Sequence, residues 1–167
     1  MRRNISEGND TMIDAAGIND KLTEMGLALP EAPKPAANYE PFVIHDGLLY
    51  VSGQIAAGPD GLITGRLGDG MTTEEGAKAA QACALSLLAQ ARAACDGDLG
   101  RIARLVKLTG FVASTPGFTE QPKVINGASD LMVELLGEAG RHARSAVGVA
   151  ALPLGVAVEI EAVFALA

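Results

Sequence analysis

Near its C-terminus the chain reads SAVGVAALPLGVAVEIEAVFAL over residues 145–166. The segment predicts two strands separated by the turn residues Leu152-Pro153-Leu154-Gly155. Apolar side chains occupy alternate positions from Val156 to Leu166, so one face of the second strand is expected to join a core. The opposite face carries Glu159 and Glu161. Carboxylates in a row on a strand indicate a face that meets water, a partner or a functional site.

Upstream of this segment, the apolar periodicity predicts further strands and amphipathic helices. The expected elements are a helix over residues 13–27, a hairpin within 42–54 turning at Asp46-Gly47, a helix after Thr72, a strand over 102–113, and a helix over 124–136. Thr72 and Glu75 have the spacing of a capping box, which marks a helix start. Within the strand over 102–113, alternation places Val106, Leu108 and Val112 on one face and Lys107 and Thr109 on the other.

These elements predict an α+β fold, a mixed sheet with two helices on one face. Residues 1–37 are expected to form a leader with a short helix and a proline linker, ahead of a domain over residues 38–167. The second face of the sheet would then have no cover. Because a monomer rarely leaves a large apolar face in water, we expect a closed oligomer in which sheets pack against sheets.

The composition restricts the partners. A net charge of −7 repels polyanions, and four Phe, two Tyr and no Trp are too few for a base-stacking surface, so no nucleic acid partner is expected. Without an export signal or a long apolar run, we expect no membrane partner and a cytoplasmic location. Cys83 and Cys95 match no metal motif and are interpreted as buried free thiols, and the glycines over 65–70 match no phosphate-binding loop. No metal or organic cofactor is expected.

Several separated pieces of the chain together resemble one known family. They are Asn38-Tyr39, Tyr50-Val51-Ser52-Gly53-Gln54, Asn126, Arg144-Ser145-Ala146-Val147-Gly148-Val149-Ala150-Ala151-Leu152-Pro153 and Glu159-Ile160-Glu161. In order and spacing they resemble the RidA/YjgF family, formerly called endoribonuclease L-PSP, over about residues 38–167. The resemblance implies a chorismate-mutase-like fold and a homotrimer around a barrel. It also implies clefts between subunits in which enamines and imines from amino-acid metabolism are hydrolysed.

The resemblance further implies roles for individual residues. Arg144 corresponds to the arginine that binds the substrate carboxylate, and Glu159 to the acid beside the attacking water. The remaining implied substrate-binding residues are Tyr39, Ser52, Gly53, Asn126 and Ala146. The chain also departs from the family, because Ala146 stands where many deaminating members have Cys and His142 stands where Pro or Ala is usual. The leader is longer than in the short members of the family.

The residues by themselves leave simpler interpretations open. Arg144 would then be a solvated arginine, Glu161 a solvated carboxylate or an ion-pair partner in the trimer, Tyr39 a contact onto the core, and His142 a structural residue. A hairpin turning at residues 152–155 would place Arg144 opposite Val163 and not opposite Glu159. The arginine and the glutamate would therefore have to meet across a cleft.

The leading hypothesis is hydrolytic deamination of small enamine or imine acids of the 2-aminoacrylate and 2-iminopropionate type. Arg144 would anchor the carboxylate, Gly53 and Tyr39 would shape the pocket, and Glu159 would orient a water. The main alternative is a non-catalytic binder of small carboxylates such as 2-oxo acids. The ribonuclease role in the older family name is disfavoured by the net charge of −7.

Overall fold

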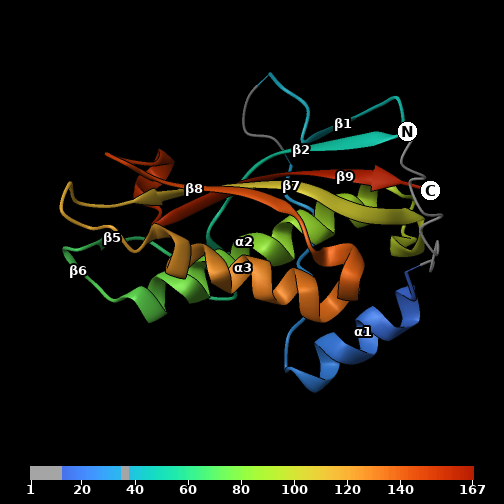
Figure 1. Cartoon of the computed structure of the whole chain (residues 1–167), viewed down its shortest axis with the longest axis horizontal. Helices are drawn as coiled ribbons and strands as arrows, with labels where there is room; N and C mark the ends of the chain where they lie inside the picture. The colour runs from blue at the N-terminus through green and yellow to red at the C-terminus, as the bar shows by residue number, and fades with distance from the viewer. Residues whose placement is uncertain (1–12, 35–37) are drawn as a thin grey trace, which may run out of the picture.

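A five-stranded mixed sheet, in the order β1-β2-β9-β7-β8, forms the centre of the molecule. The structure is a computed structural model and describes residues 13–34 and 38–167. The sheet strands are β1 (Phe42–His45), β2 (Leu48–Ile55), β7 (Ile102–Ala113), β8 (Ala143–Val149) and β9 (Val158–Leu166). Helices α2 (Thr73–Ala94) and α3 (Gln121–Leu136) lie on one face of this sheet, and α1 (Ala15–Glu24) lies beyond them (Figure 1). The predicted α+β fold with a mixed sheet is confirmed.

Short elements connect these parts. They are β3 (Ala57–Gly58), β4 (Gly61–Leu62), β5 (Arg66–Leu67), β6 (Gly70–Met71) and the 3-10 turns η1 (Leu99–Arg101), η2 (Gly137–Gly140) and η3 (Pro153–Gly155). The hairpin of β1 and β2 turns at Asp46 and Gly47, whose φ angles of 49° and 74° are both left-handed. Such a turn matches the right-handed twist of the strands it joins, which is why Asp-Gly predicted it correctly.

The helix after Thr72 forms as the sequence predicted. The Thr72 side chain accepts from the backbone N–H of Glu75, and the Glu75 carboxylate accepts from the backbone N–H of Thr72. The small residues of α2 let it lie very close to α3. A Cβ added at Gly127 of α3 would lie 2.0 Å from the carbonyl oxygen of Ala77, so only glycine permits this approach. The two helices therefore form one tightly packed layer.

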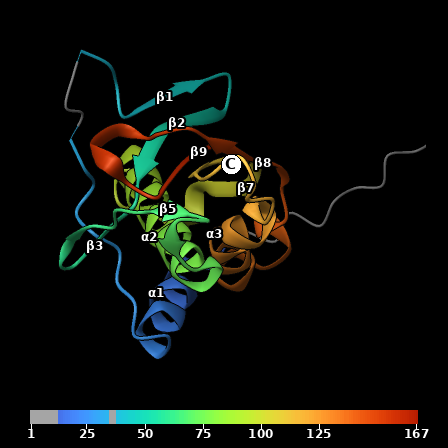
Figure 2. The ribbon, with the colours of Figure 1, turned by 90° about the vertical axis from the view of Figure 1, so that its left-hand side faces the viewer.

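The N-terminal helix forms a further layer against α3, as the view in Figure 2 shows. Asp14 caps α1, and Ile18 and Leu22 bury their side chains in the same core as the sheet and the long helices. Lys21 Nζ donates to the carbonyl oxygen of Glu134 at 2.7 Å. The division of the chain at residue 37 into leader and domain stays a prediction.

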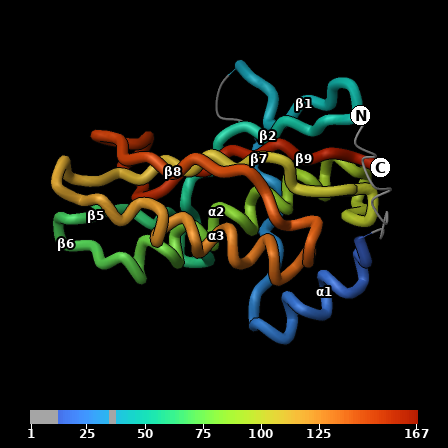
Figure 3. Tube along the Cα trace, in the orientation of Figure 1, coloured from blue at the N-terminus to red at the C-terminus, as the bar shows by residue number. Residues whose placement is uncertain are grey.

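The partner of β8 differs from the sequence prediction. β8 pairs in parallel with β7, and β7 lies between β8 and β9 in the sheet (Figure 3). In the sequence, α3 lies between β7 and β8. The predicted hairpin between residues 145–150 and 156–166 is therefore wrong. The row that contains Arg144 passes through Leu108 to Ala162, not to Val163. A helical crossover joins parallel strands, and the strongly alternating β9 takes the interior position between β2 and β7.

One face assignment in β7 is also wrong. The register of β7 against β9 shifts between Leu105 and Lys107, so the strand gains a residue there and the alternation of its side chains is interrupted. Leu105 and Leu108 are fully buried, whereas Val106 is exposed. Because of this bulge, Val106 does not share the buried face of Leu108 as predicted, whereas the assignments of Leu108 and Lys107 to opposite faces hold.

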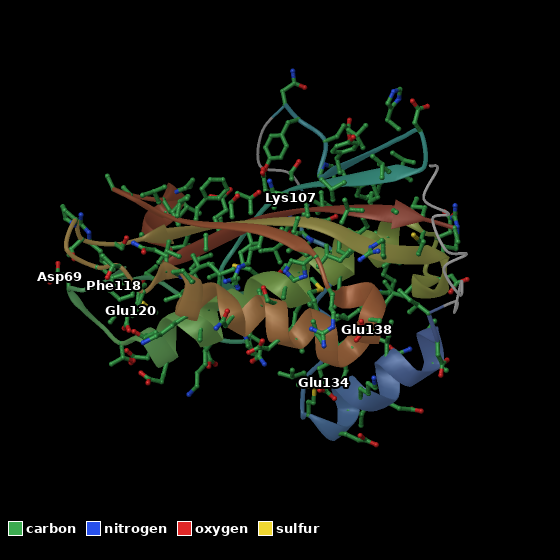
Figure 4. All side chains as sticks on the ribbon, in the orientation of Figure 1. Asp69, Lys107, Phe118, Glu120, Glu134 and Glu138 are labelled. Atoms are coloured by element: carbon green, nitrogen blue, oxygen red, sulfur yellow. The ribbon has the colours of Figure 1, made fainter. Side chains whose placement is uncertain are left out.

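The face of the sheet opposite the helices, here called the outer face, carries no α-helix among the described residues (Figure 1). Tyr50, Val43 and Val147 expose apolar surface on it. Figure 4 shows Lys107 on this side, away from Glu120 and Glu134 of the helix layer. Within residues 13–34 and 38–167, no helix combines the length and apolarity needed to cross a membrane.

Candidate functional site

Arg144 lies on the helix side of β8. Its strand neighbour Leu108 points into the core, and the Arg144 side chain reaches across to α3. One nitrogen, Nη1, donates to Asn126 Oδ1 at 2.8 Å and to Ser129 Oγ at 3.1 Å. Asn126 and Ser129 are three residues apart on α3, so they lie on the same face of the helix. Two residues that were predicted separately for the site, Arg144 and Asn126, are thus in direct contact.

The guanidinium of Arg144 can donate further hydrogen bonds after these contacts. The hydrogen bonds found for it within the described residues use Nη1 alone, and none of the ion pairs found there includes Arg144. The side chain is exposed at the edge of the sheet. A fixed guanidinium with a free Nε and Nη2 edge is the arrangement that binds a carboxylate through two parallel hydrogen bonds.

Ala146 follows Arg144 on the same side of β8. It is half-buried, packs against the core and pairs in register with Gly110 of β7. A methyl group at this position offers no proton and no nucleophile. Its contribution to a site is therefore limited to shape.

Ser129 was not predicted from the sequence. Its spacing of three residues from Asn126 is the only signal that the sequence offers, because neighbouring turns of a helix share a face. His142, interpreted as structural, bonds through Nε2 to Ser129 Oγ at 3.0 Å, and its Nδ1 lies 2.6 Å from the carbonyl oxygen of Gly140. Both residues thus join the surroundings of Arg144.

Glu159 lies on the outer face of the sheet, beside a bulge in β2. The pairing of β2 with β9 shifts between Val51 and Gln54, so Ser52 and Gly53 occupy the bulge. A Cβ on Gly53 would stand 2.0 Å from Glu159 Oε1, so the glycine makes room for the carboxylate. Burial, and to a smaller extent the charge of Glu161, raise the pKa of the Glu159 carboxyl. A carboxyl with a raised pKa is suited to accept and return a proton near neutral pH.

The same bulge holds the segment that carries Tyr39. Ser52 donates from its backbone N–H to the carbonyl oxygen of Pro41 at 3.0 Å, and from its hydroxyl to the carbonyl oxygen of Glu40 at 2.8 Å. Tyr39 itself is half exposed, with a relative exposure of 51%. This exposure leaves it able to contact a ligand or a neighbouring molecule.

The predicted site residues therefore fall into two groups within one chain. Arg144, Asn126 and Ala146 lie on the helix side of β8, whereas Glu159, with Ser52 and Gly53 beside it, lies on the outer side of β9 and β2. Glu159 pairs with Phe111 of β7, three positions along the strand from Leu108, the partner of Arg144. A single chain does not bring the two groups together.

The thiols take no part in either group. Cys83 and Cys95 are free and buried, and burial raises the pKa of both thiols, so neither is a reactive thiolate. In the part of the chain that the structure describes, no cluster of three His, Cys, Asp or Glu side chains is placed to hold a metal ion.

Comparison with known proteins identifies the family. The family described as "YjgF/chorismate mutase-like, putative endoribonuclease" matches residues 19–165. Protein TCP17 of Trypanosoma cruzi is 48% identical over 154 residues, which cover 91% of this chain and 96% of that protein. The solved structure of Atu1372 from Agrobacterium tumefaciens, a protein of unknown function, is 47% identical with a TM-score of 0.85, covering 92% of this chain and 96% of that one.

Two further solved structures agree with this result. A "putative endoribonuclease" from Shewanella oneidensis is 35% identical with a TM-score of 0.85, covering 89% of this chain and 99% of that one. The YjgF gene product of Escherichia coli is 27% identical with a TM-score of 0.57, covering 81% and 93%. The family predicted from the separated sequence pieces is confirmed, and the chain belongs to the YjgF/chorismate-mutase-like family, also known as RidA/YjgF.

Proposed function

We propose that this protein hydrolyses small enamine or imine acids, of the 2-aminoacrylate and 2-iminopropionate type, in a cleft between subunits. The observation that carries the proposal is Arg144, an exposed guanidinium that Asn126 and Ser129 hold by one nitrogen. Its free edge suits the carboxylate of a small amino-acid derivative, and the proposal assigns it that role.

Glu159 supplies the proton chemistry in this proposal. Water adds to the imine carbon as the Glu159 carboxylate takes one of its protons. The carboxyl then returns that proton to the nitrogen, which gives a carbinolamine. The Glu159 carboxylate next takes the hydroxyl proton of the carbinolamine and delivers it to the nitrogen as the carbon–nitrogen bond breaks, so that ammonia leaves and a 2-oxo acid remains. The raised pKa of Glu159 supports this role. A group that acts first as a base and then as an acid is most effective when its pKa is close to the working pH.

The proposed cleft requires more than one chain. Arg144 and Glu159 lie on opposite sides of the sheet, so we assign the complete site to groups from adjacent subunits of a homotrimer. The apolar side chains of the outer face, such as Tyr50 and Val147, support the assembly because their burial between subunits would be favourable. Small carboxylate-bearing metabolites and further copies of the chain are thus the proposed partners, in the cytoplasm.

A non-catalytic binder of 2-oxo acids is the second candidate. Ala146 favours it, because a methyl group stands where many deaminating relatives carry a thiol. Such a binder would use Arg144 in the same way and would not turn over an imine.

A coupled assay separates the two candidates. An amino-acid oxidase generates 2-iminopropionate in situ, and its loss is followed with wild type, Arg144→Ala and Arg141→Ala. Arg141 is a matched control, since this exposed arginine lies three residues away and pairs with Glu138. We expect acceleration by wild type and Arg141→Ala, and a loss of about thirtyfold or more in kcat/KM for Arg144→Ala.

Two results would contradict this proposal in different ways. Wild type that binds pyruvate without accelerating imine loss would reject the enzyme in favour of the binder. Turnover by wild type that is unchanged in Arg144→Ala would keep the enzyme but remove the arginine from its site. The mass of each sample by light scattering shows whether lost activity reflects a lost assembly instead.

A further inference from the structure

A directed chain of hydrogen bonds runs from Arg144 into the protein. Arg144 Nη1 lies 3.1 Å from Ser129 Oγ, and Ser129 Oγ lies 3.0 Å from His142 Nε2. His142 Nδ1 in turn lies 2.6 Å from the carbonyl oxygen of Gly140. Ser129 and His142 are both half-buried, and the chain leads from the exposed arginine to a buried glycine.

The donors and acceptors of this chain have only one consistent direction for a neutral imidazole. The carbonyl oxygen of Gly140 can only accept, so Nδ1 of His142 carries the hydrogen. Nε2 is then an acceptor, and the Ser129 hydroxyl donates to it. With its hydrogen directed at His142, the Ser129 oxygen presents lone pairs to Arg144, which can only donate.

The far end of this series of hydrogen bonds, the carbonyl of Gly140, is held in place by close backbone packing. Gly140 ends η2 and packs so closely on α3 that an added Cβ would lie 2.2 Å from the carbonyl oxygen of Met132. The carbonyl that fixes the imidazole is therefore held on the same helix that carries Ser129 and Asn126. The imidazole of His142 is thus held between two groups placed by α3, the Ser129 hydroxyl and the Gly140 carbonyl oxygen.

Arg144 benefits from this arrangement because a free arginine has many rotamers. Asn126 and Ser129 each accept one of the two Nη1 hydrogens, which fixes the plane of the guanidinium. Fixing a long side chain before a ligand arrives removes an entropic cost from binding. A serine whose hydroxyl hydrogen was free to rotate would face Arg144 with a hydrogen part of the time.

We propose that Ser129 and His142 are positioning residues for Arg144, with His142 in the Nδ1–H tautomer setting Ser129 as an acceptor. This inference rests on the proposed function, because the group that Arg144 receives is the carboxylate of that substrate. Neither residue touches the ligand. Both act by keeping the free edge of the guanidinium aimed out of the protein.

The tautomer gives a test that does not depend on activity. Long-range proton–nitrogen spectra of the full-length protein, recorded at mildly alkaline pH, report which imidazole nitrogen carries the hydrogen. The chain has two histidines, and the other, His45, is the exposed last residue of β1 and serves as the internal reference. We expect the hydrogen of His142 on Nδ1. A hydrogen on Nε2 would overturn the inference.

Matched substitutions test the effect on the ligand site. His142→Gln keeps an acceptor near the position of Nε2, whereas His142→Asn keeps only a donor near the position of Nδ1. Ser129→Thr keeps the hydroxyl and Ser129→Ala removes it. Asp130→Ala, an exposed neighbour on α3, is the control. The measurements are Kd for pyruvate by calorimetry, KM and kcat for imine hydrolysis, and the melting temperature.

We expect Ser129→Ala and His142→Asn to raise Kd and KM about fivefold, the size of one lost hydrogen bond, with kcat nearly unchanged. His142→Gln, Ser129→Thr and Asp130→Ala should stay within about twofold of wild type. A merely structural role would lower the melting temperature or the mass without this rescue by the conservative variants.

The outcomes separate this inference from the proposed function. Pyruvate binding that weakens in Ser129→Ala, without imine turnover by any variant, rejects the enzyme and keeps the positioning role. Turnover that depends on Arg144 but not on Ser129 or His142 keeps the enzyme and rejects the positioning role. Wild type that binds no pyruvate and hydrolyses no imine rejects both.

Discussion

The charged groups on the two faces of the central sheet have different surroundings. On the helix side, Arg144 has acceptors from its own chain, Asn126 and Ser129. On the outer side, burial and Glu161 raise the pKa of Glu159, and no hydrogen bond to its carboxylate is found within the described residues. One group is thus oriented by its own chain, whereas the other lies on a face with little cover. The difference teaches that a single chain prepares the carboxylate-binding half of the proposed site more fully than the proton-transfer half.

The apolar surface shows the same contrast along β9. Ile160 and Phe164 are fully buried under α2, while the alternate Glu161 is exposed on the outer face. On the helix side, a single chain already buries its apolar side chains in a packed core. The outer side gains burial only from another molecule, which is the physical basis of the proposed trimer.

The largest effect is expected from a charge on the outer face. Tyr50→Asp places a carboxylate on that face, in the shallow hollow that Glu161 also lines. We expect loss of the proposed trimer and of the proposed turnover, with the chain still folded because the Tyr50 side chain is exposed in the single chain. Light scattering and the coupled assay measure both effects. Leu62→Asp, on the β3–β4 hairpin outside the five-stranded sheet, is the control. A Tyr50→Asp protein that stays trimeric would show that the outer face is not the interface.

Arg144→Lys tests whether geometry or charge matters on the helix side. A lysine ammonium is a point charge on a flexible stem and does not present a planar fork to a carboxylate. We expect kcat/KM for Arg144→Lys to fall at least about tenfold and to lie nearer to Arg144→Ala than to wild type. Arg141→Lys is the matched control. Near-normal kcat/KM in Arg144→Lys would mean that the site needs only a positive charge.

Gly53→Ala tests the outer half of the site. The new Cβ would overlap the present position of Glu159 Oε1, so the carboxylate must move away. If Glu159 transfers the proton, we expect kcat to fall about tenfold, with a smaller change in KM. Gly58→Ala is the control, because a Cβ there meets Ile63 Cδ1 at an ordinary 3.8 Å. Unchanged kcat in Gly53→Ala would argue against a catalytic carboxylate at this position.

The smallest effect is expected on stability. The raised pKa of Glu159 means that the folded protein binds this proton more tightly than the unfolded chain does. Ionised Glu159 therefore costs stability at neutral pH, and the cost disappears as the pH falls through the raised pKa toward the ordinary value of 4.5. We expect Glu159→Gln to melt slightly higher than wild type at pH 7 and at the same temperature below pH 4.5. Thermal scans across this pH range, with Glu31→Gln as control, measure the difference. A difference that grows on acidification has the wrong sign and would contradict the assignment.

Much of the local structure was decided by the sequence alone. The Asp46-Gly47 turn and the Thr72 to Glu75 capping box depend on residues that are neighbours in the chain, so their patterns predicted them correctly. The alternation in β9 likewise assigned Ile160 and Glu159 to opposite faces before any partner strand was known. The order and spacing of the separated pieces sufficed to predict the family.

The tertiary structure decided what depends on residues distant in the chain. A strand pattern states which side chains share a face but not which strand lies beside it, so the pairing of β8 with β7 was missed. The bulge that exposes Val106 arises from the register against β9, which no local pattern records. Ser129 became part of the site only because the crossover through α3 sets that helix beneath β8. The separation of Arg144 and Glu159 onto opposite faces follows from that topology. Local propensity acts over a few residues, whereas strand order and helix placement are set by the burial of apolar faces across the whole chain.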